Sequence, residues 1–114
     1  MKLTKDQEQK FEEYAITYAN TFKNALLYES SDKYLKFFAE RRWDAFIIDY
    51  LERRMGLEYD DIHDNKTLFN KYMKIMLPIF KDIREQLKVE HENKEKKRLE
   101  EEKEKRIKKH KKGR

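Results

Sequence analysis

Cysteine is absent from this sequence of 114 residues, and it contains only one proline and two glycines. Without cysteine the chain can form no disulfide, no zinc–thiolate site and no cysteine nucleophile. Turns between strands and phosphate-binding loops depend on glycine and proline, so their scarcity disfavours sheets and nucleotide-binding loops. The composition therefore predicts long helices joined by few connections.

Long apolar segments are absent as well. The longest apolar run, AFII at residues 45–48, is far shorter than the roughly 20 residues of a membrane-spanning helix. The opening segment MKLTKDQEQKFEEYA has no apolar stretch of the kind found in a signal peptide. From these two features we expect a cytoplasmic protein that does not enter a membrane.

The first expected helix follows Thr4, which forms a possible capping box with Gln7. In this motif each of the two side chains bonds to the backbone of the other residue. Apolar residues at spacings of three and four then define one face of a helix. They are Phe11, Tyr14, Ala15, Tyr18, Phe22, Ala25 and Leu26. We expect this helix to end near Glu29.

The second expected helix runs from Asp32, capped by Ser31, to Met55, where Gly56 supplies the C-cap. Its apolar residues cover more than half of its circumference, which is typical of a helix packed on several sides. We therefore expect this helix to be the centre of the fold. A second copy of the chain is expected to cover what the other helices leave exposed.

The third expected helix begins after Asp64 or Asn65 and carries one apolar stripe. Pro78 lies inside it and predicts a kink near Leu77, because proline removes a backbone hydrogen bond and clashes with the preceding turn. Beyond Val89 the stripe stops, but acids continue to stand four residues before bases. Each such pair supports a helix by about 0.2–0.5 kcal/mol. The predicted fold class is therefore all-α, a three-helix bundle whose third helix is kinked at Pro78 and extends as a charged, solvated C-terminal helix.

Charge divides the chain into a helical bundle domain at 1–91 and a lysine-rich tail, helical or disordered, at 92–114. The first part holds sixteen Lys and Arg against seventeen Asp and Glu, and the tail holds twelve against six. The net charge of +5 therefore comes from the tail. Its last basic residues are uninterrupted by acids: Lys105, Arg106, Lys108, Lys109, Lys111, Lys112 and Arg114.

A run of cations of this kind binds nucleic acid by displacing counterions from the phosphates, so its affinity ignores base sequence and falls steeply with salt. The same run also suits an acidic protein partner, or serves only to keep the chain in solution. No aromatic residue lies among these cations, so the tail offers no base stacking. Because apolar neighbours are missing too, the tail has nothing to insert into a membrane surface.

Aromatic residues and arginines concentrate in the second expected helix. Core packing explains this concentration, and so does a partner or dimer interface, where buried Trp, Tyr and Arg are common anchors. The candidate interface residues are Arg42, Trp43, Phe46, Ile47 and Tyr50. The arginines of this helix, Arg41, Arg42, Arg53 and Arg54, suit either phosphate contact or pairing within the protein.

No arrangement of residues predicts catalysis. The carboxylates of the second helix, Glu40, Asp44, Asp49 and Glu52, have no histidine beside them. The segment YDDIHD, at residues 59–64, offers possible ligands for a divalent ion, but it lacks the alternating acids and internal glycine of a calcium loop. The alternative for this segment is an exposed acidic connection. We therefore expect no enzyme, no cofactor, no metal and no small-molecule substrate.

The predicted function is that of a small α-helical protein that self-associates and contacts nucleic acid through its basic tail. One alternative is a protein-binding modulator, such as a phage-type inhibitor or adaptor that docks its second helix on a host protein. Another is a scaffold or assembly component in which the charged helix is a spacer.

Overall fold

A computed structural model describes the backbone of residues 2–112 and the side chains of residues 2–101. Within residues 2–112 the regular structure is entirely helical, which confirms the all-α class. The elements in chain order are α1 (Lys5–Asn20), α2 (Asp32–Arg41), α3 (Trp43–Phe46), the π-helix η1 (Ile47–Glu52), α4 (Arg53–Met55), α5 (Tyr59–Ile62) and α6 (Lys66–Lys112).

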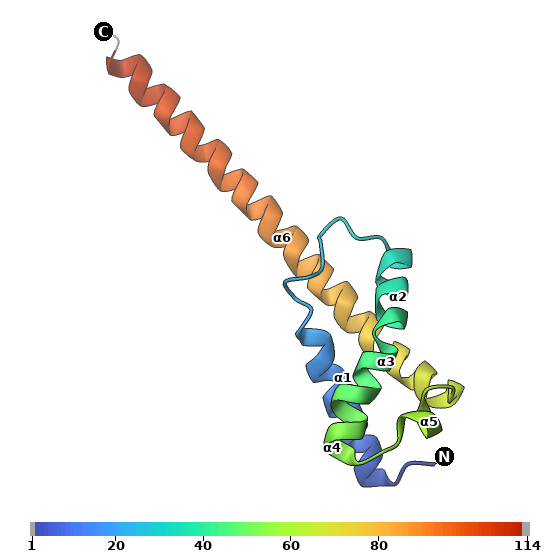
Figure 1. Ribbon diagram of the computed structural model, residues 1–114. Helices are drawn as coiled ribbons and strands as arrows, with labels where there is room; N and C mark the ends of the chain where they lie inside the picture. The colour runs from blue at the N-terminus through green and yellow to red at the C-terminus, as the bar shows by residue number, and fades with distance from the viewer. Residues whose placement is uncertain (1, 113–114) are drawn as a thin grey trace.

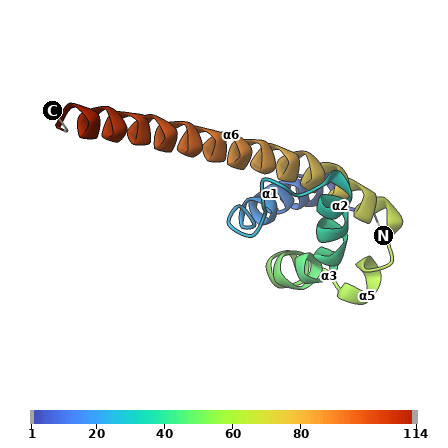
Figure 2. The same cartoon turned by 90° about the horizontal axis from the view of Figure 1, so that it is seen from above.

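The long helix α6 is the axis of the molecule (Figure 1). The shorter helices pack against the first half of α6, and its second half extends away from them as a free-standing rod. Seen from above, α1, α2 and α3 all lie to one side of α6 (Figure 2). The molecule is correspondingly elongated, with principal extents of 79 × 24 × 19 Å.

Helix α1 begins as predicted and ends earlier than predicted. The capping box is present, with the Gln7 amide N–H donating to Thr4 Oγ1 at 3.2 Å and the Thr4 N–H to Gln7 Oε1 at 3.0 Å. The helix ends at Asn20 rather than near Glu29. There the Asn20 side chain donates to the Ile16 carbonyl, and the Thr21 hydroxyl donates to the Tyr18 carbonyl. Such side-chain bonds compete with the helical ladder, which explains the early end.

The second expected helix is divided. Its two ends are as predicted, because Ser31 Oγ accepts the Tyr34 N–H at 3.1 Å and Gly56 adopts a left-handed φ of 70°. Between them α2 ends at Arg41, and the chain continues through α3, η1 and α4. Figure 2 shows α2 from the side and α3 nearly end-on, so the chain changes direction between them. A simple three-helix bundle is therefore not confirmed.

Helix α6 is one uninterrupted element with Pro78 inside it, so the predicted kink is not confirmed. Asn65 caps its start, since Asn65 Oδ1 accepts the Leu68 N–H at 3.2 Å. Pro78 has no N–H to give to the carbonyl of Lys74. Because both residues are exposed, water can bond to that carbonyl, and the helix tolerates the proline there.

Aromatic rings form the centre of the core. Phe46 is fully buried, and its ring centroid lies 5.5 Å from that of Phe11, 5.6 Å from that of Tyr18 and 5.2 Å from that of Tyr72. These rings come from α3, α1 and α6. Aromatic pairs at such distances add about 0.5–1.5 kcal/mol each beyond the area they bury. The short segment α3 is therefore held between the two longer helices.

Candidate nucleic-acid interface

Helix α6 concentrates the positive charge of the protein. Residues 66–112 hold seventeen Lys and Arg against nine Asp and Glu, whereas residues 1–65 hold ten against fourteen. The boundary between basic and acidic parts therefore follows the start of α6, not residue 92. The other helices cover one side of α6 and leave its opposite side to solvent (Figure 2).

Six of the tail residues predicted to contact nucleic acid, those at positions 105–112, stand at the far end of α6. The helical backbone continues to Lys112, so these six belong to the part of α6 that projects beyond the body (Figure 1). The side chains of Lys105, Arg106, Lys108, Lys109, Lys111 and Lys112, and all of Arg114, lie outside the described residues. Every side chain from 92 to 101 is exposed, so this part of the extension is solvated as predicted.

A second set of cations was missed by the sequence-based prediction. Lys74, Lys81 and Lys88 are spaced seven residues apart on α6 and are all exposed. Seven residues make nearly two helical turns, so the three side chains share one face at intervals of about 10.5 Å. We call them the lysine row. Glu95 occupies the next position of the repeat and ends it. The seven-residue spacing is visible in the sequence, beside the apolar stripe from which this helix was predicted.

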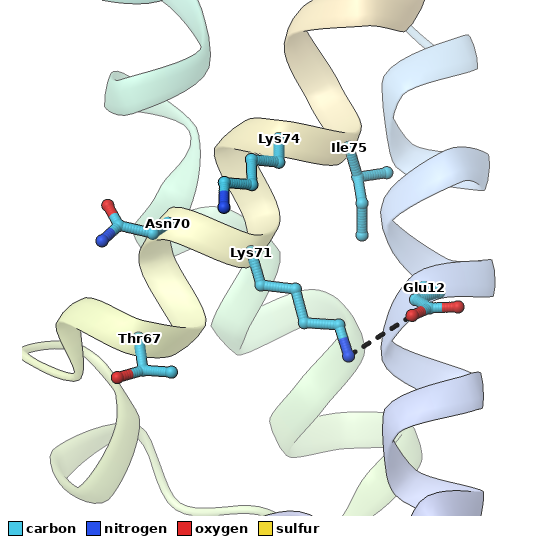
Figure 3. A pocket seen from close by; sticks show the side chains of 6 residues that line it. All are labelled: Glu12, Thr67, Asn70, Lys71, Lys74 and Ile75. Atoms are coloured by element: carbon cyan, nitrogen blue, oxygen red, sulfur yellow. Dashed lines mark ion pairs between the residues drawn. The ribbon is translucent and has the colours of Figure 1, made fainter.

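Lys74 also borders a hollow of about 430 Å³ between α1 and α6 (Figure 3). The remaining lining residues are Glu12, Thr67, Asn70, Lys71 and Ile75. Lys71 reaches across to α1, where its Nζ lies 3.4 Å from Glu12 Oε1. That ion pair neutralises Lys71, so Lys74 is the lysine of this hollow that lacks a carboxylate partner within its lining.

Most of the predicted partner interface is inside the protein. Phe46 and Ile47 are fully buried, Trp43 is 5% exposed and Tyr50 is 8% exposed. The Trp43 indole donates to the His63 carbonyl at 3.0 Å. Because these four side chains are covered by their own chain, their burial favours core packing, the other explanation that the sequence offers, and the interface stays a prediction. Only Arg42 of the predicted set is exposed.

This burial also changes the argument for self-association. A second copy was expected because three helices seemed too few to cover the central one. In the structure α1 and α6 supply the cover, since Tyr14 of α1 packs on Tyr50 at 5.6 Å and Tyr72 of α6 packs on Trp43 at 5.0 Å. Self-association stays a prediction without that support.

Two arginines of the second expected helix cover core aromatics. The Arg42 guanidinium lies 4.8 Å from the centroid of the Phe38 ring, and that of Arg54 lies 4.6 Å from the Tyr50 ring. Cation–π contacts of this kind hold a charged group at the surface while its flat face packs on carbon. Arg42 and Arg54 therefore complete the core, which favours pairing within the protein over phosphate contact.

The carboxylates considered for acid–base chemistry connect elements instead. Glu52 Oε2 accepts the backbone N–H of Tyr59 at 3.2 Å. A hydrogen bond with Asp44 raises the pKa of the Tyr59 hydroxyl. Both contacts fasten α5 to the segment formed by α3 and η1. Asp44 and Glu52 thus have structural partners.

The acidic segment at 59–64 forms α5 and the turn after it. Among the side chains that the structure describes, no group of three or more His, Asp or Glu converges as a metal site would require. The described helices also include none that is long and apolar enough to cross a membrane.

The exposed surface of α2 carries aromatic and basic side chains together. Tyr34 is 46% exposed and Phe37 is 53% exposed, and Lys33 and Arg41 are exposed as well. Phe37 lies four residues after Lys33, three residues after Tyr34 and four residues before Arg41. Spacings of three and four place all four side chains on one face of the helix. The Arg41 guanidinium lies 5.5 Å from the Phe37 ring centroid. We call these four residues the α2 face.

No protein-family model, curated protein or solved structure matches this chain. Its function is therefore inferred from its own charge distribution and geometry.

Proposed function

We propose that the protein binds nucleic acid along the outer side of α6, by charge and without reading base sequence. The observation that carries the proposal is the exposed lysine row, Lys74, Lys81 and Lys88, on a helix that continues into the basic tail. The residues before α6 have an acidic surplus. Because α6 is basic and the residues before it are acidic, a polyanion is attracted to α6 and repelled by the rest of the molecule.

The physical basis is counterion release. Each phosphate neutralised by Lys or Arg frees a condensed cation, so the affinity gains entropy and depends on salt. A rod of exposed cations matches a phosphate backbone without needing a pocket. The helix holds these cations at regular intervals, which reduces the entropy lost when they align with phosphates.

A salt titration tests this proposal. We expect labelled duplex and single-strand oligonucleotides to bind the full chain at about 50 mM salt and to dissociate as salt rises toward about 200 mM. Replacing the lysine row by glutamine should weaken binding. It should also make the slope of log K against log salt shallower, by about 0.9 for each duplex phosphate that the variant no longer neutralises. Replacing the six tail cations at residues 105–112 should do so more strongly.

A matched control raises the net positive charge of α6 instead of lowering it. Glu92, Glu100 and Glu101 are exposed acids on the same helix, and their replacement by glutamine should strengthen binding and steepen the salt dependence. Binding that is undetectable at low salt contradicts the proposal. It would leave the two other predicted functions, a protein-binding modulator and a spacer in an assembly. Binding that is indifferent to all three sets of substitutions contradicts it equally.

A further inference from the structure

We propose that the α2 face stacks the unpaired bases of a single-stranded nucleic acid. This inference rests on the proposed function and adds a preference to it, namely single strands over duplex. Two half-exposed rings, Tyr34 and Phe37, lie on one helical face with Lys33 and Arg41. Aromatic platforms flanked by cations are the usual means by which proteins hold single strands without sequence preference.

The two rings lie outside the buried core. Leu35 and Ala39 are the fully buried residues of α2 and hold the helix against the body. Tyr34 and Phe37 instead leave about half of their surface in water. Exposed aromatic area has an energetic cost that a stacked base would relieve. The tail supplies cations but no aromatic residue, so α2 and not the tail offers rings on which bases can stack.

Charge is the reason to assign this face to nucleic acid. Surfaces that bind proteins are depleted of lysine, whereas here Lys33 lies on the same face as the rings. The Arg41 guanidinium is 5.5 Å from the Phe37 ring centroid, a position from which it can add a cation–π contact to a stacked base.

The start of α2 is joined to α6, the helix that carries the lysine row. Arg84 Nη1 of α6 is 2.6 Å from Oδ1 of Asp32, the first residue of α2. This hydrogen bond lowers the pKa of the Asp32 carboxyl, and the charge of Lys81 adds to the effect. The first residue of α2 therefore lies against α6 at Arg84, three residues along that helix from Lys81 of the lysine row.

The test compares a labelled oligothymidylate with a duplex of the same length. Phe37→Ala should lower the affinity for the single strand by about 5- to 150-fold, the range expected when one base stack is removed. It should leave the affinity for the duplex unchanged, since paired bases cannot reach the ring. Phe37→Leu should weaken binding nearly as much as Phe37→Ala because leucine keeps the apolar bulk but has no π face. Phe37→Tyr should retain binding.

Ile16→Ala is the matched control, because Ile16 is 47% exposed and lies on α1, outside both the α2 face and α6. It should change neither affinity. The chain has a single tryptophan, Trp43, which is 5% exposed, so its emission shows whether each variant keeps the core.

The outcomes separate this inference from the proposed function. If Phe37→Ala weakens duplex and single strand equally, or weakens neither, the stacking platform is wrong while salt-dependent binding by α6 still stands. If the wild-type chain binds neither oligonucleotide, the proposed function fails first. If Phe37→Ala leaves binding intact and changes the mass of the protein in solution, the face joins two copies of the chain, and the inference is overturned.

Discussion

The hydroxyl of Tyr72 donates a 2.8 Å hydrogen bond to the backbone carbonyl of Ala39 inside the core. Both residues are fully buried, and burial raises the pKa of Tyr72 far above its ordinary value. The phenol therefore remains a neutral donor at neutral pH. The same carbonyl also accepts the Arg42 N–H at 3.1 Å, so Tyr72 of α6 bonds to α2 where that helix ends.

We expect Tyr72→Phe to lower the free energy of unfolding by about 0.5–1.5 kcal/mol, the net value of one hydrogen bond. The larger penalty of an orphaned buried group does not apply, because the Ala39 carbonyl keeps its bond from Arg42. Urea denaturation followed by Trp43 fluorescence measures the change. The control is Tyr34→Phe at a half-exposed ring, which should stay within about 0.5 kcal/mol of wild type. Equal effects at the two sites would contradict the role assigned to the buried bond.

Arg84 ties the loop before α2 to α6. Its Nη1 donates to the Ser30 carbonyl at 3.0 Å and to Asp32 Oδ1 at 2.6 Å. The hydrogen bond from Arg84 holds the pKa of Asp32 below its ordinary value of 3.8. A carboxyl whose pKa is lower in the folded state stabilises the fold above its unfolded pKa. This contribution disappears as the pH falls through the folded value.

Asp32→Asn should therefore lower stability near neutral pH and have less effect below pH 3.8. Urea midpoints of wild type and variant, measured at several pH values, should approach each other as the solution becomes acidic. Asp61→Asn, at an exposed position in α5, is the comparison, and near neutral pH it should lower the urea midpoint less than Asp32→Asn does. A difference between Asp32→Asn and wild type that stays constant with pH would show that the ion pair does not contribute.

Helix ends were the part of the fold that the sequence predicted best. The caps at Thr4, Ser31, Asn65 and Gly56 all occur as expected or as one of two expected alternatives. A cap depends on a side chain and on backbone groups three or four residues away. The relevant chemistry is thus contained in a short stretch of sequence and changes little with tertiary structure.

The division of the second expected helix could not be predicted in this way. The apolar pattern of that helix continues past Arg42. The side chain that donates to the Ala39 carbonyl at the break is that of Tyr72, which is 33 residues away in the sequence. The orientation of the aromatics has the same origin. Phe37 and Phe46 are equally apolar, and only packing against α1 and α6 determines that Phe46 is buried and Phe37 is half exposed. The sequence alone therefore does not distinguish the buried candidate interface residues, such as Phe46, from the exposed aromatic residues of α2.

Gly56 closes α4 with a φ of 70°, and a Cβ placed there would meet no atom within 4 Å. The cost of Gly56→Ala is therefore one of backbone conformation alone, and we expect the free energy of unfolding to fall by about 1–2 kcal/mol. Gly56→Asn should lower it less, because asparagine visits the left-handed region more readily. Equal urea midpoints for the two variants would contradict this account of the C-cap.

The extension of α6 should be the least protected helix backbone in the described chain. Side chains at 92–101 are all exposed, so the helix there is held by its own hydrogen bonds and weak charge pairs. Tyr72 and Met76, by contrast, are fully buried on the same helix, and their amides should open only with the whole fold. Hydrogen exchange should therefore be at least about a hundredfold faster at 92–101 than at these two positions. Adding an oligonucleotide should slow exchange in the extension if α6 binds it, whereas high protection of the free protein there would mean that a second copy already covers the rod.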